Sequence, residues 1–254
     1  MKTLVTAIQK GGQGKTFSTC HLAFDFSERG LKVLVVDLDP QANASYTLDN
    51  HKSGYVASRL FNDTAEVVKA FFSERDNSGI TLIEGDGKLA NLEQGVTTQG
   101  AIEALRSNIK ALNEFFDVCL IDTPPTLGKA MVAAIAASDF VVSPIELERY
   151  SMEGMKKMIA VILNLRKEYP DVQFLGMLPN LVDLRKPRDK TNLEQLQKAY
   201  PQFVMPLKVD DRNSIAEALG ERKPVWKIRK TAARKARQEV REYCQYVFER
   251  MEIA

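Results

Sequence analysis

The sequence predicts an α/β fold, built as a doubly wound and mostly parallel sheet with helices on both faces. Three observations support this prediction. Short strand-like segments are apolar nearly throughout, longer segments with helical periodicity separate them, and a glycine-rich loop follows the first strand. A chain of 254 residues with 44% hydrophobic and 27% charged content can bury one full core. We therefore expect a single domain over residues 1–254.

The expected strands and helices alternate along the chain. The strands are Leu4–Ile8, Val33–Leu38, Ile80–Ile83, Val118–Ile121, Phe140–Ser143, Phe174–Leu178 and Val204–Pro206. The helices lie near residues 15–29, 64–73, 101–116, 127–137, 151–168, 190–199, 212–219 and 232–250. Gly30 is placed to end the first helix in a left-handed conformation, and Pro170 follows the helix at 151–168. Residues 40–60 are rich in Asn, Ser and Gly, so we expect a loop with short helical turns there.

Composition argues against several classes of protein. Cys20, Cys119 and Cys244 are widely spaced and form no CxxC pair, which argues against a disulfide framework and a zinc site. We expect them to be buried, reduced thiols in a cytoplasmic protein. No run of about 18 apolar residues occurs, and Met1 stands almost directly before the first strand, so we expect neither a transmembrane helix nor a signal peptide. The net charge of +2 does not by itself indicate a partner.

A glycine-rich loop joins the first strand to the first helix, and we call residues 10–16 the phosphate loop. Its sequence is Lys10-Gly11-Gly12-Gln13-Gly14-Lys15-Thr16. Glycines let successive N–H groups turn toward one anion, and the following helix adds its positive N-terminal end. Lys15 can reach the terminal phosphates of a nucleotide, and the Thr16 hydroxyl can bind magnesium. A glycine-rich turn alone would be weak evidence, but the strand, the GK[ST] ending and the helix agree. We expect Gly11 to Phe17 to bind a nucleotide.

Carboxylates end two of the expected strands. Asp37 and Asp39 share one face of a strand that Pro40 ends, at the carboxyl edge where open α/β sheets bind ligands. The alternative for Asp37 is that it merely caps the loop. Asp122 ends an apolar strand, where a carboxylate is costly to bury unless it is paired or near a metal. Asp122 is therefore expected to hold Mg²⁺ through water. The alternative is a helix N-cap, for which Thr126 is the better candidate.

These segments resemble the deviant Walker A P-loop ATPases of the ParA/MinD superfamily. The phosphate loop looks like the family's Walker A motif with its extra lysine, residues 37–43 resemble switch I, and residues 117–125 resemble Walker B. The resemblance implies that Lys10 reaches across a dimer interface to the partner's nucleotide. It also implies that Asp39 orients the attacking water and that Asp37 lies near the magnesium shell. The expected catalytic residues are therefore Lys10, Lys15 and Asp39, and the expected metal ligands are Thr16, Asp37 and Asp122.

Further matches and departures refine the resemblance. Asn180 matches the position where family members contact adenine, and Pro206 is expected to contact the nucleotide as well. Phe17 stands where the family usually has a second threonine that contacts the α-phosphate. Only a backbone N–H is then left to contact this phosphate, so we expect nucleotide affinity to be lower than in members with the threonine. Ala42 replaces the usual glycine, which restricts the switch loop slightly. The closest similarity is to short ParA-type partition ATPases that lack an N-terminal helix-turn-helix domain, so we expect no operator-specific autoregulation.

Residues 227–241, which we call the basic segment, hold seven basic residues and one acid. On one continuous helix from Lys227 to Arg241, a 3, 4, 3, 4 spacing would form a single stripe suited to DNA phosphates without reading sequence. If the helix starts at Thr231, the first two lysines leave the stripe. A solvated surface face is the alternative, and the family resemblance favours DNA. The candidates are Arg212, Lys227, Arg229, Lys230, Arg234, Lys235, Arg237 and Arg241, and the loop at 185–190 is a candidate extension of this surface.

The resemblance implies an ATP-dependent DNA partition ATPase. It would bind ATP and Mg²⁺, form a homodimer on ATP, bind double-stranded DNA non-specifically and be reset by slow hydrolysis that a ParB-type centromere-binding partner stimulates. We expect it to be cytoplasmic and nucleoid-associated. One alternative is a MinD-like membrane ATPase, although the short tail from Tyr246 carries two glutamates, which disfavour anionic lipid. Others are a metabolic enzyme on this scaffold, such as an electron carrier or an amide ligase, and an ATPase that positions protein cargo.

Overall fold

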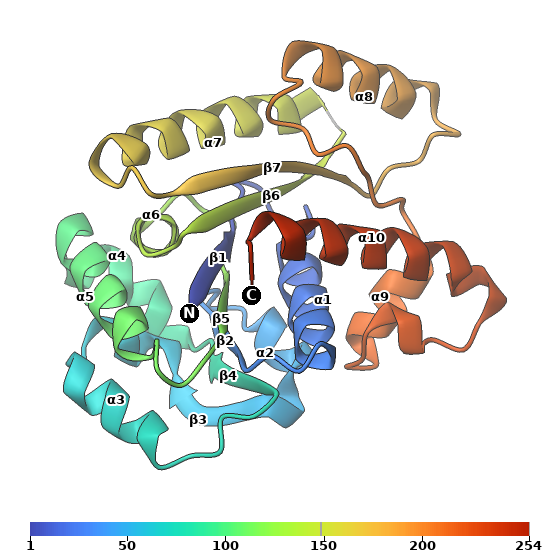
Figure 1. Ribbon diagram of the computed structural model, residues 1–254. Coiled ribbons are helices and arrows are strands. Elements are labelled where there is room, and N and C mark those ends of the chain that lie inside the picture. Colours follow the sequence, from blue (N-terminus) through green and yellow to red (C-terminus); the bar gives the residue numbers. More distant parts are fainter. Residues whose placement is uncertain (148, 254) are drawn as a thin grey trace.

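A parallel β-sheet runs through the middle of the molecule, with helices packed on both of its faces (Figure 1). The computed structural model describes residues 1–147 and 149–253, and for 149–155 it describes the backbone alone. Within these residues the strands are β1 (Lys2–Thr6), β2 (Val33–Asp37), β3 (Lys52–Val56), β4 (Ile80–Glu84), β5 (Val118–Asp122), β6 (Phe140–Glu146) and β7 (Gln173–Asn180). Their order is β3-β4-β2-β5-β1-β6-β7, and every neighbouring pair is parallel. The predicted fold class is confirmed.

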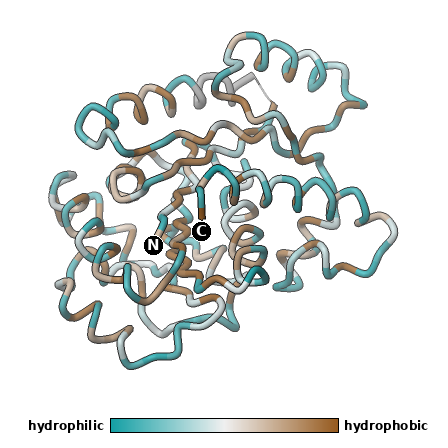
Figure 2. Tube along the Cα trace, viewed as in Figure 1, coloured by the Kyte–Doolittle hydropathy of each residue, from teal (hydrophilic) through white to brown (hydrophobic). Residues whose placement is uncertain are grey.

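The helices form two layers over the sheet. They are α1 (Lys15–Glu28), α2 (Asn43–Thr47), α3 (Ala65–Ser73), α4 (Leu92–Gly95), α5 (Thr98–Ala111), α6 (Lys129–Ala136), α7 (Arg149–Glu168), α8 (Pro187–Ala199), α9 (Asn213–Gly220) and α10 (Arg234–Arg250). One hydrophobic cluster joins the sheet to α3, α5, α6 and α7, and a second joins it to α1, α9 and α10. Figure 2 shows hydrophobic segments gathered along the sheet. Burial on both faces explains why the strands are apolar throughout. Among the described residues, no helix is long and apolar enough to cross a membrane.

Three expectations about the elements are wrong or incomplete. Residues 40–60 contain α2 and also the strand β3, whose pairing with β4 overrides the poor strand propensity of Ser53 and Gly54. Val204–Pro206 is not a strand, and Val204 makes only an isolated bridge to Met177; Pro206 has no N–H to continue a ladder. The last helix begins at Arg234, after a short 3₁₀ turn at residues 231–233. The left-handed residue expected after α1 is confirmed, because Gly30 has a φ of 89°.

His21 fixes the C-terminal part of the chain to α1. Its Nε2 accepts a hydrogen bond from the Val225 N–H at 3.2 Å, so Nδ1 carries the ring proton and donates to the Phe17 carbonyl at 3.0 Å. Burial lowers the pKa of His21 to about 4, against the opposing effect of the Phe17 carbonyl. The folded protein therefore holds this imidazole neutral.

We expect the stability that His21 contributes to be present above pH 6.5 and to be lost as the pH falls toward 4. Between these values the unfolded chain binds a proton that the folded chain rejects, because the pKa is depressed from 6.5 to about 4. The full effect is about 3 kcal/mol. Urea unfolding at pH 7.5 and 4.5 checks this in wild type and in His21→Gln, which can also donate and accept. The stability difference between the two proteins should shrink at the lower pH. A difference that does not change with pH would refute the assignment.

Candidate functional site

The phosphate loop turns sharply at two glycines between β1 and α1. Gly12 and Gly14 have φ values of 75° and 97°, in the left-handed region that favours glycine. At Gly14 a Cβ atom would also collide with the side-chain amide of Asn180. Gly14 immediately precedes α1, whose first N–H groups have no partner within the helix. The loop and helix end therefore form a site that favours an anion.

Gln13 anchors the phosphate loop to the ends of two strands. Its carbonyl accepts a hydrogen bond of 2.8 Å from the Asn180 side-chain amide at the end of β7. Its own side chain donates to the Glu146 carboxylate at 3.2 Å and accepts from the Glu146 N–H at 2.8 Å, at the end of β6. Lys10 Nζ lies 3.8 Å from the same carboxylate. The sequence indicated neither of these anchoring roles, because the partners lie more than 130 residues away from the loop.

Asp122, Thr16 and Lys15 form a buried charged cluster beneath the loop. Thr16 Oγ1 donates to Asp122 Oδ2 at 2.7 Å, and Lys15 Nζ donates to the Lys10 carbonyl at 3.2 Å. Burial and the nearby charge of Asp37 raise the pKa of Asp122 to about 8, against the Thr16 hydrogen bond and the Lys15 charge. Burial also lowers the pKa of Lys15, although Asp122 and Asp39 oppose that shift. The other Asp122 oxygen, Oδ1, is buried and has no hydrogen-bond partner among the described residues. The carboxyl group thus has one oxygen available for a cation.

Asp37 holds the segment that follows β2. Its Oδ2 accepts hydrogen bonds from the N–H and hydroxyl of Ser45 at 2.8 and 2.7 Å, and its Oδ1 accepts from the Asp39 N–H at 3.1 Å. Both carboxylate oxygens are therefore engaged in the loop, which favours the capping alternative over direct metal ligation. Asp39 Oδ1 accepts from the Gln41 N–H at 2.9 Å. Ala42, where the family has glycine, adopts a left-handed φ of 55°, which is strained for a residue with a Cβ.

A cavity of about 490 Å³ opens beside the phosphate loop. Gly11 to Phe17 and Asp39 line it, and Tyr46 and Leu219 also contribute to its lining. Neither Asn180 nor Pro206 lines this cavity: the Asn180 amide is buried on Gln13, and Pro206 is exposed. The cavity lies at the carboxyl edge of the sheet, where ligands bind in open α/β folds.

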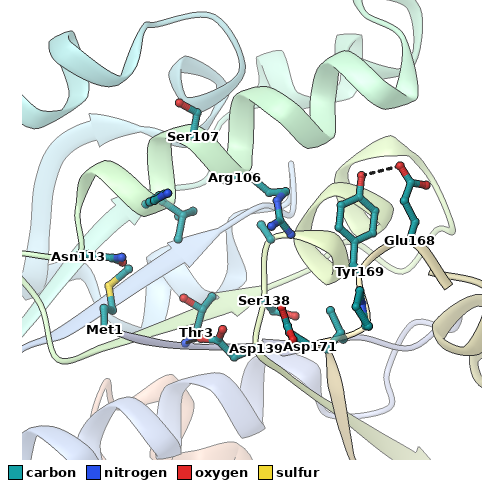
Figure 3. A pocket seen from close by; sticks show the side chains of 15 residues that line it. Met1, Thr3, Arg106, Ser107, Asn113, Ser138, Asp139, Glu168, Tyr169 and Asp171 are labelled. Carbon is teal, nitrogen blue, oxygen red and sulfur yellow. Dashed lines mark hydrogen bonds between the residues drawn. The ribbon is translucent and has the colours of Figure 1, made fainter. Parts of the chain in front are cut away.

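A second cavity, of about 440 Å³, lies at the opposite edge of the sheet (Figure 3). Thr3 and Asp139 contribute to it from the beginnings of β1 and β6, and Arg106 lies over the ring of Tyr169 at 4.8 Å. The Tyr169 hydroxyl donates to Glu168 at 3.2 Å. This cavity shares no residue with the first one, so it is separate from the phosphate loop.

Several of the basic candidates form ion pairs or hydrogen bonds within the protein. Arg212 binds Glu239 and Asp210, Lys230 binds Glu217 at 2.6 Å, and Lys227 lies 3.6 Å from Glu28. Arg237 donates to the carbonyls of Ile228 and Lys230, and Arg241 pairs with Asp25 and Glu28. The prediction of a single stripe along one continuous helix is wrong, because α10 begins only at Arg234 and does not include Lys227 or Lys230.

Five of the basic candidates are exposed, and three of these have side chains without a partner among the described residues. The side chains of Arg229, Arg234 and Lys235 make no hydrogen bond or ion pair with any other described residue, whereas the exposed Lys227 and Lys230 are paired. Lys235 and Arg185 line the same groove, of about 970 Å³, together with Asp183, and Arg185 is itself paired with Asp183 at 2.8 Å. The position of Arg229, Arg234 and Lys235 leaves their charges available to a partner.

We expect Asn180→Ala to weaken the binding of ATP and GTP by similar factors. The reason is that the Asn180 amide supports the Gln13 carbonyl of the phosphate loop, and losing one buried hydrogen bond costs about 1–3 kcal/mol whichever base is bound. Competition titrations with both nucleotides check this, with wild type for comparison. A selective loss of ATP would show instead that Asn180 reads the adenine base.

The comparisons with known proteins agree with this geometry. A family model described as an AAA domain matches residues 1–174. Protein IncC of Escherichia coli is 61% identical over 254 residues, covering 100% of this chain and 71% of IncC. The chromosome-partitioning ATPase Soj of Thermus thermophilus is 32% identical over 186 residues, covering 73% of this chain and 71% of Soj. The solved structure of apo McdA from Cyanothece has a TM-score of 0.81 at 25% identity, covering 95% of this chain and 98% of McdA. The chain belongs to the ParA/MinD superfamily of P-loop ATPases and is an ATP-binding protein of the ParA/Soj type.

Proposed function

We propose that this chain is a DNA partition ATPase that binds ATP with Mg²⁺, dimerises on ATP, holds DNA without reading its sequence and is reset by hydrolysis. The observation that carries the proposal is the cavity at the carboxyl edge, where the phosphate loop meets Lys15, Thr16 and Asp39. The similarity to IncC and to the chromosome-partitioning ATPase Soj supports partition as the process. A ParB-type partner would stimulate a slow intrinsic turnover and would decide which cargo is moved.

Two residues fit a magnesium ion beside the phosphates. The Thr16 hydroxyl and the Asp122 carboxylate are 2.7 Å apart, and Asp122 Oδ1 has no partner among the described residues. Oxygen ligands of this kind suit Mg²⁺, which would neutralise charge on the β- and γ-phosphates. Asp37 is assigned to the outer part of the site, because Ser45 and Asp39 occupy its oxygens.

Catalysis by this site is electrostatic and positional. The N–H groups of the phosphate loop and the Lys15 ammonium bind the phosphates, and Asp39 on the cavity wall orients the attacking water. Phe17 offers only its backbone N–H to the α-phosphate, so nucleotide affinity is expected to be lower than with threonine there. Lys10 does not line the cavity and lies beside Glu146. We therefore assign Lys10 to the nucleotide of a second chain across the dimer.

Arg229, Arg234 and Lys235 are the residues we assign to DNA. They are exposed, and they lie close together in sequence at the start of α10. Flexible cations of this kind bind phosphates and carry no sequence information directly. We assign the other basic candidates to contacts within the same chain; they are Arg212, Lys227, Lys230, Arg237 and Arg241.

We expect Arg234→Glu with Lys235→Glu to abolish DNA binding and leave ATP-driven dimerisation intact. Gel shifts across a salt series, with and without a non-hydrolysable ATP analogue, check this alongside light scattering. Wild-type binding should be indifferent to sequence, should strengthen with ATP, and should weaken with salt at a log–log slope of roughly −3.6 for about four phosphate contacts.

Two further variants serve as controls in the same experiment. Arg250→Glu reverses an exposed charge at the other end of α10 and should bind DNA normally. Lys10→Ala should bind ATP and stay monomeric. Wild-type DNA affinity in the double variant would mean that this surface is only solvated. An ATP-dependent dimer of Lys10→Ala would exclude the role of Lys10 across the interface.

A further inference from the structure

The C-terminal helix α10 packs against α1, the helix that begins at the phosphate loop (Figure 1). Tyr243 of α10 and Ser18 of α1 share a hydrogen bond between their hydroxyl groups, and both side chains are fully buried. The ring of Tyr243 also stacks on that of Phe17, with 6.4 Å between centroids and 27° between planes. Tyr243 therefore contacts the two residues that directly follow Thr16.

Ser18 and Phe17 are themselves tied to the nucleotide site. The Ser18 N–H donates to the Gly14 carbonyl at 2.9 Å, and Phe17 lines the cavity beside the phosphate loop. A phosphate that enters the loop contacts backbone groups one or two residues away from these contacts. The Tyr243 hydroxyl is therefore connected to Gly14 of the phosphate loop through Ser18.

Further along the two helices, an ion pair with one buried partner joins α10 to α1. The Asp25 carboxylate is completely buried, pairs with Arg29 at 2.6 Å and also pairs with Arg241 of α10. The Arg241 guanidinium lies 3.6 Å from the centroid of the Trp226 ring. Removing Arg241 would leave the buried Asp25 charge with Arg29 as its remaining partner, so these contacts help to hold the two helices together.

We propose that Tyr243 is a positioning residue for the phosphate loop, and that ATP and DNA influence each other's binding through its contact with Ser18 and Phe17. The DNA half of this inference rests on the proposed function. Arg234 lies nine residues before Tyr243 on the same helix, about 14 Å away along the axis. In this proposal, phosphate bound at the first turn of α1 shifts the exposed cations of α10 through the contact of Tyr243 with Ser18 and Phe17. By linkage, DNA must then change ATP affinity by the same factor as ATP changes DNA affinity.

Tyr243→Phe tests the inference, because it keeps the ring and removes the hydroxyl. Tyr246→Phe is the matched control, since Tyr246 lies three residues further on α10 and its hydroxyl makes no hydrogen bond with the described residues. ATP affinity is measured with a fluorescent ATP analogue, with and without a DNA duplex, and the ratio of the two affinities is the coupling factor. Thermal unfolding verifies that each variant is folded, and Ser18→Ala replaces Tyr243→Phe if that protein does not fold.

We expect wild type and Tyr246→Phe to show a coupling factor of about fivefold or more. In the absence of DNA, Tyr243→Phe should bind ATP about fivefold more weakly than wild type, which corresponds to the loss of one hydrogen bond. Its coupling factor should fall below about twofold. Wild-type ATP affinity together with full coupling in Tyr243→Phe overturns the inference, and so does an equal loss in Tyr246→Phe. If DNA has no effect on the ATP affinity of wild type, the coupling half of the inference is overturned, and the gel shifts decide separately whether DNA binds. The ATP affinity of Tyr243→Phe without DNA then decides the positioning role by itself.

Discussion

The burial of negative charge at the carboxyl edge of the sheet is the constraint on which the site depends. Asp37 and Asp122 end adjacent parallel strands in register, and both side chains are almost fully buried. Two carboxylates in this position are costly unless hydrogen bonds or cations compensate them. Ser45 and the Asp39 N–H compensate Asp37, and Thr16 with Lys15 compensates Asp122 in part. Asp122 keeps one oxygen without a partner in the described chain, which gives the site its demand for a cation beside the phosphates.

The sequence predicted the fold class and the centre of the site because both depend on local rules. Strands buried on both faces are apolar throughout, so the parallel sheet could be recognised from composition within short segments. The phosphate loop needs glycine where φ is positive, as at Gly12 and Gly14, and it needs Lys15 and Thr16 at the start of a helix. The carboxylates were found for a similar reason, because parallel strands bring their carboxyl ends to one edge. The cavity joins Lys15, Thr16 and Asp39, whereas Asp122, which was expected there too, does not line it and is hydrogen-bonded to Thr16.

What the sequence did not predict depends on contacts between distant segments. Asn180 was expected to contact adenine, and the hydrogen bond from its amide to the Gln13 carbonyl, 167 residues away, was not foreseen. The basic segment has helical spacing, yet local turns before Arg234 direct Lys230 to Glu217. Arg241 was expected to be part of a DNA surface, and in the structure it pairs with the buried Asp25 of α1. In each case the polar side chain has a partner in another segment of the chain, and that partner could be identified only from the tertiary structure.

The central claim is that ATP binds at the phosphate loop and that Lys15 is the cation that holds its phosphates. Isothermal titration of ATP with Mg²⁺ into Lys15→Ala tests it most directly, with Asp39→Ala as the matched removal of a charge that lines the same cavity. The account predicts that Lys15→Ala binds ATP at least 100-fold more weakly than wild type, equivalent to about 2.7 kcal/mol, while Asp39→Ala stays within about threefold. Near-normal ATP affinity in Lys15→Ala would contradict the account.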